Sequence, residues 1–288
     1  MDFRGNFVAL VTPFRQDGSI DWDALERLVE DQIAGRVSGL VPCGTTGESP
    51  TLSHEEHDEV IARVVGFAAG RVPVVAGTGS NSTAEAIRSS RHAEESGAAA
   101  LLLVAPYYNK PSQEGLYRHY HAIAEACGLP IVVYNIPGRC SVEIAHETLV
   151  RLAAHPRIVA VKEATGNLLH VSELRRDTGL QVLAGDDALT LPALALGGCG
   201  VVSVASNLEP ARMSRLVAAA LAGDLEGARA VHDELFPLMK GLLSLATNPL
   251  PVKTGLALRG KVAEVFRLPL CPMAEGPREE LRALVEAL

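Results

Sequence analysis

The sequence predicts an α/β protein built as a (β/α)8 barrel, the TIM-barrel architecture, with a C-terminal helical extension. Eight short apolar runs alternate with segments of helical periodicity between residues 7 and 204, which is the order of elements in such a barrel. The runs are continuously apolar, as expected for parallel strands that are covered on both faces. A doubly wound open sheet is the alternative, but it usually has fewer strands, and no G-x-G-x-x-G motif follows any run.

The predicted strands are short and rich in β-branched and other apolar residues. They are expected at residues 7–12, 39–42, 72–76, 99–104, 129–134, 158–161, 180–184 and 200–204. Glycine, proline or hydroxyl-bearing residues follow most of these runs and indicate the loops between elements.

Helices are predicted from periodicity and from capping signals. Apolar residues recur at helical spacing over residues 22–33, and the patterns Ser53-x-x-Glu56 and Ser82-x-x-Glu85 each open a helix. Further helices are expected at residues 112–127, 143–153, 211–221, 225–245, 252–258 and 278–288. We therefore expect the barrel strands and the active-site loops within residues 1–209, and the last barrel helix with the extension, a packing or oligomer surface, within residues 210–288.

The composition excludes several classes of protein. The chain has 288 residues, a net charge of −8 and no basic run, so nucleic acid is not an expected partner. The apolar runs are shorter than the ~18 residues of a membrane span, and Asp2, Arg4 and Asn6 make a signal peptide unexpected. Five widely spaced cysteines form no C-x-x-C motif, which predicts free thiols and a cytoplasmic location.

A lysine follows the sixth predicted strand. Residues 158–161 are apolar and Lys162 comes directly after them. A charged amine at the tip of a buried strand is costly, whereas a neutral amine avoids that cost and is a nucleophile. The alternative is that Lys162 extends to the surface and stays solvated.

The other polar residues that follow strands fall on the same predicted face, because the active site of this fold lies at the carboxyl ends of its strands. They are Thr45, Thr46, Tyr107, Tyr108, Tyr134, Arg139, Gly185 and Val202 with Ser203. Phenols and hydroxyls suit the proton transfers of imine chemistry, and a guanidinium suits a carboxylate. No His/Asp/Glu constellation accompanies them, so we expect no metal. Taken singly, each has a simpler explanation: rim packing for a tyrosine, an ordinary turn for the threonines, and solvation for the arginine.

Six motifs resemble one family of enzymes in order and spacing. They are Gly44-Thr45-Thr46-Gly47-Glu48, Pro106-Tyr107-Tyr108-Asn109, Tyr134-Asn135-Ile136-Pro137-Gly138-Arg139, Lys162-Glu163-Ala164-Thr165-Gly166-Asn167, Gly185-Asp186-Asp187 and Asn248-Pro249-Leu250-Pro251-Val252-Lys253. The chain resembles the dihydrodipicolinate (4-hydroxy-tetrahydrodipicolinate) synthases from end to end. These belong to the pyruvate-dependent class I aldolases, which include N-acetylneuraminate lyase.

The resemblance implies four catalytic residues. Lys162 would form an imine with pyruvate, and Tyr134 would be the main proton donor and acceptor. Thr45 would link Tyr134 to Tyr108, and Tyr108 would reach in from a neighbouring subunit.

The resemblance also implies the substrate contacts. Thr46 would hold the pyruvate carboxylate, Val202 and Gly185 would help to seat the pyruvyl group, and Arg139 would receive the carboxylate of aspartate semialdehyde. Thr46, where sialic-acid lyases carry serine, and Arg139 favour the synthase. Pro50 departs from the small residue that is common in related synthases.

The implied reaction is the condensation of pyruvate with L-aspartate-4-semialdehyde in lysine and diaminopimelate biosynthesis. It needs no external cofactor, and the implied assembly is a homotetramer of two dimers. Two alternatives stay open: an aldolase or lyase for a sugar acid, and a barrel that binds a keto acid without catalysis.

A regulatory site is implied by the same resemblance. The residues that align with the lysine-binding positions of feedback-inhibited members are Ser49, His54, His57, Asn81, Glu85 and Tyr107. We therefore expect L-lysine to act as an inhibitor. A metal pair at His54 and His57 is disfavoured, because no further ligands accompany them.

Overall fold

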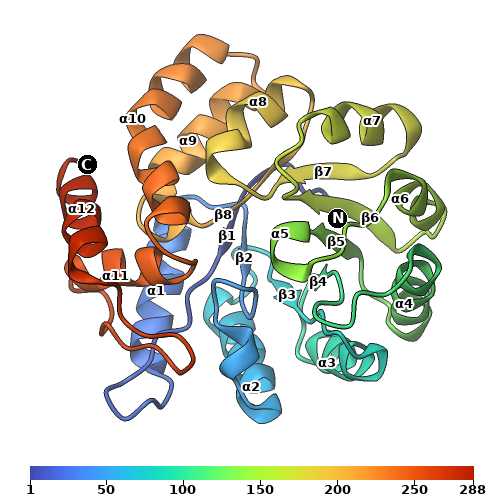
Figure 1. Cartoon of the computed structure of the whole chain (residues 1–288), viewed down its shortest axis with the longest axis horizontal. Helices are drawn as coiled ribbons and strands as arrows, with labels where there is room; N and C mark the ends of the chain where they lie inside the picture. Colours follow the sequence, from blue (N-terminus) through green and yellow to red (C-terminus); the bar gives the residue numbers. More distant parts are fainter.

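The computed structural model describes residues 1–288 and is a (β/α)8 barrel (Figure 1), as the sequence predicts. The strands are β1 (Gly5–Ala9), β2 (Gly39–Val41), β3 (Val75–Gly77), β4 (Ala100–Val104), β5 (Ile131–Asn135), β6 (Ile158–Glu163), β7 (Gln181–Ala184) and β8 (Gly200–Ser203). All are parallel, in the order β2-β1-β8-β7-β6-β5-β4-β3. A bridge between Leu40 and Val74 joins the two ends of the sheet and closes the barrel.

The strands are surrounded by a layer of helices (Figure 1). These are α1 (Trp22–Ala34), α2 (His54–Ala68), α3 (Thr83–Glu95), α4 (Gln113–Ala126), α6 (His146–Ala153), α7 (Leu169–Asp177), α8 (Thr190–Ala195) and α9 (Pro210–Leu221). The sequence pattern does not predict α7, α8 or the four-residue α5 (Pro137–Cys140) after β5, because short helices carry little periodicity. The C-terminal helices α10 (Leu225–Ser244), α11 (Leu250–Leu258) and α12 (Glu275–Glu286) lie together on one side of the barrel (Figure 1).

Two capping predictions have different outcomes. At the start of α2, Ser53 and Glu56 form the complete reciprocal capping box. At the start of α3, the Ser82 side chain accepts from the backbone N–H of Glu85, but the Glu85 carboxylate accepts from the Ser80 hydroxyl at 2.8 Å. The backbone N–H of Glu85 therefore takes part in the cap, but its side chain bonds to Ser80 and does not complete a capping box.

The side chains of each strand point alternately outward and inward, and this alternation separates two apolar cores. The large core fills the space between the strands and the helices, and the smaller core fills the barrel itself. On β6, Val161 belongs to the outer core and Ala160 to the inner one. Because side chains alternate along a strand, Lys162 points to the inside with Ala160.

No helix of the structure has the length and apolar character needed to cross a membrane. The five cysteines are all free thiols, three of them buried.

Candidate active site

Lys162 lies inside the barrel beside Tyr134. The two residues are register partners on β6 and β5, so their side chains leave adjacent strands at the same level. The Lys162 Nζ is 4.0 Å from the centroid of the Tyr134 ring, and both residues are only 5% exposed. The alternative of a solvated surface lysine is therefore wrong.

Burial changes the acid–base properties of this amine. Desolvation lowers the pKa of Lys162 to about 7 from its ordinary value of 10.5. The buried carboxylate of Asp187 acts in the opposite direction, and the guanidinium of Arg139 lowers the pKa further. Near neutral pH, a large fraction of Lys162 is thus a neutral amine, the form that attacks a carbonyl carbon.

Tyr134 is adapted to hold and pass a proton. Its burial raises the pKa of the phenol well above the ordinary value, and the Thr45 side chain acts in the opposite direction. The phenol therefore stays protonated over the physiological range. The phenol can donate its proton and then take up another proton from a neighbouring group, as a proton relay requires.

A cavity of about 120 Å³ lies in front of the amine and brings six of the predicted residues together. These are Thr45, Thr46, Tyr134, Arg139, Lys162 and Gly185. Val202 is buried in the barrel core and does not line the cavity, whereas Val204 does. Leu243 and Asn248 also line it, and both belong to the part of the chain expected to be an appendage. The division at residue 209 therefore does not separate the site from the C-terminal helices.

Asn248 connects the two predicted carboxylate-binding residues. Its side-chain amide donates to the Thr46 hydroxyl at 2.9 Å, and its carbonyl oxygen accepts from Nη2 of Arg139 at 2.9 Å. The side-chain oxygen of Asn248 is buried without a hydrogen-bond partner and remains available as an acceptor. Asn248 opens the last of the six sequence motifs, but the motif alone does not predict its function.

Gly185 is required by the close approach of β7 and β6 beside Lys162. Its N–H donates to the Glu163 carbonyl at 2.7 Å. A Cβ at this position would be 2.9 Å from that same carbonyl oxygen and 2.5 Å from the Ala164 Cβ. A larger residue would therefore displace the end of the strand that carries Lys162.

A second cavity of about 200 Å³ adjoins the first and shares Thr45, Tyr134 and Arg139 with it. Its other walls include Ser49 and Tyr107, two of the residues predicted to bind lysine. The structure therefore places two of the six predicted regulatory residues in a cavity that Thr45 and Tyr134 also line.

The remaining regulatory candidates lie near this second cavity. The side-chain amide of Asn81 donates to the Tyr107 carbonyl at 3.2 Å, and His54 Nε2 is 4.0 Å from Glu85. His57 is turned inward, where its Nε2 is 2.9 Å from the Gly77 carbonyl oxygen. Of the predicted set, His57 is thus the one whose side chain faces the barrel wall.

Tyr108 does not reach the cavities of its own chain. It is 89% exposed, lines neither cavity, and has a left-handed backbone with a φ of +73°. A non-glycine residue in that conformation is uncommon, and here it directs a large apolar side chain into solvent.

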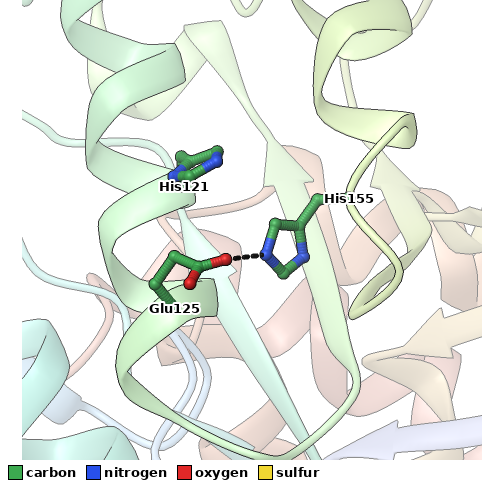
Figure 2. A group of neighbouring side chains, drawn as sticks. All are labelled: His121, Glu125 and His155. Carbon is green, nitrogen blue, oxygen red and sulfur yellow. Dashed lines mark hydrogen bonds and ion pairs between the residues drawn. The ribbon is translucent and has the colours of Figure 1, made fainter.

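A cluster formed by α4 and the segment before β6 resembles a metal site but has the chemistry of a hydrogen-bonded histidine–glutamate pair. His121, Glu125 and His155 lie within 4.8 Å of one another (Figure 2). The backbone N–H of Arg157 donates to His155 Nδ1 at 3.2 Å, so the ring proton is on Nε2, which donates to Glu125 at 2.8 Å. A metal-bound histidine normally donates from its second nitrogen, and here that nitrogen accepts. Two arginines also line the same hollow and would repel a cation.

The chain is similar to known synthases over its whole length. The 4-hydroxy-tetrahydrodipicolinate synthase of Syntrophus aciditrophicus is 54% identical over 286 residues, which is 99% of this chain and 98% of that protein. Among solved structures, the dihydrodipicolinate synthase of Acinetobacter baumannii complexed with pyruvate matches with a TM-score of 0.96 and 44% identity, covering 99% of this chain and 98% of that one. The enzyme of Cyanidioschyzon merolae with lysine bound matches with a TM-score of 0.95 and 40% identity, covering 100% and 99%. The model of the dihydrodipicolinate synthetase family matches residues 2–288, and the chain therefore belongs to this family.

Proposed function

We propose that this enzyme condenses pyruvate with L-aspartate-4-semialdehyde through an imine on Lys162, giving 4-hydroxy-tetrahydrodipicolinate for lysine and diaminopimelate biosynthesis. The observation that carries this proposal is the buried amine with a pKa of about 7 on the wall of the cavity. Loss of water from the carbinolamine gives the imine, which acts as an electron sink. A proton then leaves the pyruvyl methyl group, and the enamine carbon attacks the aldehyde. The reaction needs no external cofactor, because the imine itself supplies the sink.

The proton transfers are assigned to Tyr134, Thr45 and the neighbouring subunit's copy of Tyr108. Tyr134 lies against the amine and Thr45 shares its cavity. The exposure of Tyr108 supports a function at a subunit interface. We therefore propose a homotetramer of two dimers, in which each dimer completes its own sites.

The carboxylates are assigned to Thr46 and Arg139. Thr46 lines the cavity, is held by Asn248 and suits the pyruvate carboxylate. Arg139 lines both cavities and offers its guanidinium to the carboxylate of the second substrate. Gly185 keeps β7 close to Lys162, and Val202 forms the barrel core beneath the pyruvyl group.

Borohydride trapping tests the proposal. With pyruvate, wild type should gain one covalent adduct at Lys162, and Lys162→Arg should gain none. The trapped enzyme should lose its turnover of aspartate semialdehyde. Turnover of sialic acid in place of aspartate semialdehyde would establish the sugar-acid lyase instead, and binding of pyruvate without an adduct would establish a non-catalytic barrel.

Mixed dimers test the shared site. A dimer of Tyr108→Phe with Lys162→Ala contains one site with its own Lys162 and the other chain's intact Tyr108. In an equal mixture with random exchange, half of the dimers are mixed and each has one intact site, so activity should rise to about a quarter of the wild-type value. Mixtures that stay as weak as their components would show that Tyr108 does not act across the interface.

We also propose that L-lysine inhibits the enzyme at the second cavity. The exposed carboxylate of Glu85 suits the ammonium group of the ligand, and Ser49, Asn81, His54 and Tyr107 lie near it. Glu85→Thr should remove inhibition and leave activity intact, whereas Glu95→Thr on the same helix should remain inhibited. Equal inhibition of both variants would refute the assignment, and a wild type that ignores millimolar lysine would refute inhibition itself.

A further inference from the structure

A second lysine is fully buried, and the proposed chemistry does not use it. Lys253 on α11 places its Nζ 2.5 Å from the Oε1 of Glu48, and both side chains are 0% exposed. Glu48 ends the turn that carries Thr45 and Thr46. An ion pair in the interior is costly to form, so its presence needs an explanation beyond stability.

The surroundings of Lys253 are unlike those of Lys162. The rings of Phe14 and Phe266 lie 4.0 and 5.3 Å from its Nζ, and it lines neither of the two cavities. The other Glu48 oxygen accepts from the backbone N–H of Arg267 at 3.4 Å. Lys253 is therefore enclosed and paired, which makes it a structural cation and excludes it as the nucleophile.

The turn that this pair holds is strained at both ends. Cys43 and Glu48, the residues on either side of Gly44–Gly47, each have a φ of +55° although neither is glycine. Such a conformation costs on the order of 1 kcal/mol per residue and persists only where surrounding contacts enforce it. The Thr12 hydroxyl donates to the Gly47 carbonyl at 2.7 Å, and Asn248 donates to Thr46. Thr12 belongs to the barrel, whereas Asn248 and Lys253 come from the C-terminal extension.

We propose that the Glu48–Lys253 ion pair is a positioning device, through which the C-terminal extension holds the Thr45–Thr46 turn at the correct distance from Lys162. The inference rests on the proposed function, because it concerns how the pyruvate carboxylate is bound. Without the pair, the strained turn relaxes and Thr46 withdraws from the carboxylate. Displacements of about 1 Å at such contacts are enough to reduce rates by about 10²-fold.

The test compares Glu48→Gln, Lys253→Met and the double variant. Lys253→Met leaves a carboxylate buried and unpaired, so this variant should lose stability. The double variant removes both charges and should recover most of the melting temperature. The informative readout is the pyruvate concentration that gives half-maximal borohydride trapping on Lys162. It should rise about tenfold in the double variant and less in Glu48→Gln, which keeps the shape of the side chain and one hydrogen bond. The KM for aspartate semialdehyde should stay unchanged.

Lys261→Met is the matched control, because it removes a lysine from the extension whose ion pair with Asp31 is exposed. It should trap pyruvate as wild type does. The proposal would be overturned by a double variant that folds and reaches half-maximal trapping at the same pyruvate concentration as wild type, because the pair would then be only structural. If the double variant fails to fold, Glu48→Gln is judged by the same criterion. Failure of wild type to trap pyruvate would refute the proposed function and this inference with it, whereas normal trapping by wild type with an unchanged double variant would refute the inference alone.

Discussion

Imine formation on Lys162 should depend on pH with a midpoint near 7. The amine must be neutral to attack pyruvate, and desolvation lowers its pKa to about 7. At pH 7, about half of the amine is then neutral. A lysine with the ordinary pKa of 10.5 is neutral in only about one molecule in three thousand, so burial increases the reactive fraction roughly 1,500-fold.

Two substitutions should move this midpoint in opposite directions. The charged groups that act on the amine are Asp187, which raises its pKa, and Arg139, which lowers it. Asp187→Asn should therefore shift the midpoint to lower pH. It also keeps an oxygen for the backbone N–H groups of Val204 and Ala205, which donate to Asp187 at 3.0 and 2.8 Å. Arg139→Gln should shift the midpoint to higher pH.

The assay is the initial rate of pyruvate trapping with cyanoborohydride between pH 5.5 and 9.5, read by intact-protein mass. Pyruvate is the only substrate present, so loss of the second substrate's contacts in Arg139→Gln does not affect the measurement. A wild-type midpoint above 9 would refute the argument from burial. Shifts of the same sign in both variants would refute the electrostatic assignment.

Further predictions concern the other groups of the site. Tyr134→Phe should reduce kcat about 10²–10⁴-fold, because it removes a proton donor, while the melting temperature stays close to that of wild type; unchanged kcat would exclude Tyr134 from the relay. Lys162→Met should raise the free energy of unfolding by roughly 4 kcal/mol at pH 7 and by roughly half of that at pH 9. The folded-state pKa of Lys162 is lowered, so the cost of burying the amine is fully present below pH 7 and disappears as pH rises toward 10.5. Denaturant unfolding at both pH values checks this, and a gain that is larger at pH 9 would contradict it.

The sequence was sufficient for the barrel and for the centre of the site. Eight apolar runs located all eight strands, and the rule that catalytic groups follow such strands located Lys162, Tyr134 and Thr45. These predictions succeed because strand period and register alone decide which side chains share the inside of a barrel. Tyr134 and Lys162, for example, are paired by register alone.

The contributions from distant segments could not be predicted in this way. Leu243 and Asn248 enter the cavity from helical or turn segments beyond the last strand, and no periodic signal relates them to Lys162. The capping motif also could not predict the direction of the Glu85 side chain, because the Ser80 hydroxyl competes with the capping box for the carboxylate. Tyr108 is exposed in the single chain, and neither the pattern nor the fold supplies a group for it to contact, so its function at a subunit interface stays a prediction.

These cases change the interpretation of the C-terminal helices. A segment that only covered the barrel would contribute apolar contacts, and α10–α12 do contribute such contacts to the outer core. A segment that only covered the barrel would not place a buried lysine, Lys253, against Glu48 at the end of the Thr45–Thr46 turn. It would also not place the amide of Asn248 on the Thr46 hydroxyl. Charged and polar groups are expensive to bury, so a contribution to stability is a weak explanation for their presence there. The extension is therefore better understood as part of the candidate active site: the barrel supplies the amine and the phenol, whereas α11 and the preceding Asn248 contact the Thr45–Thr46 turn, to which we assign the pyruvate carboxylate.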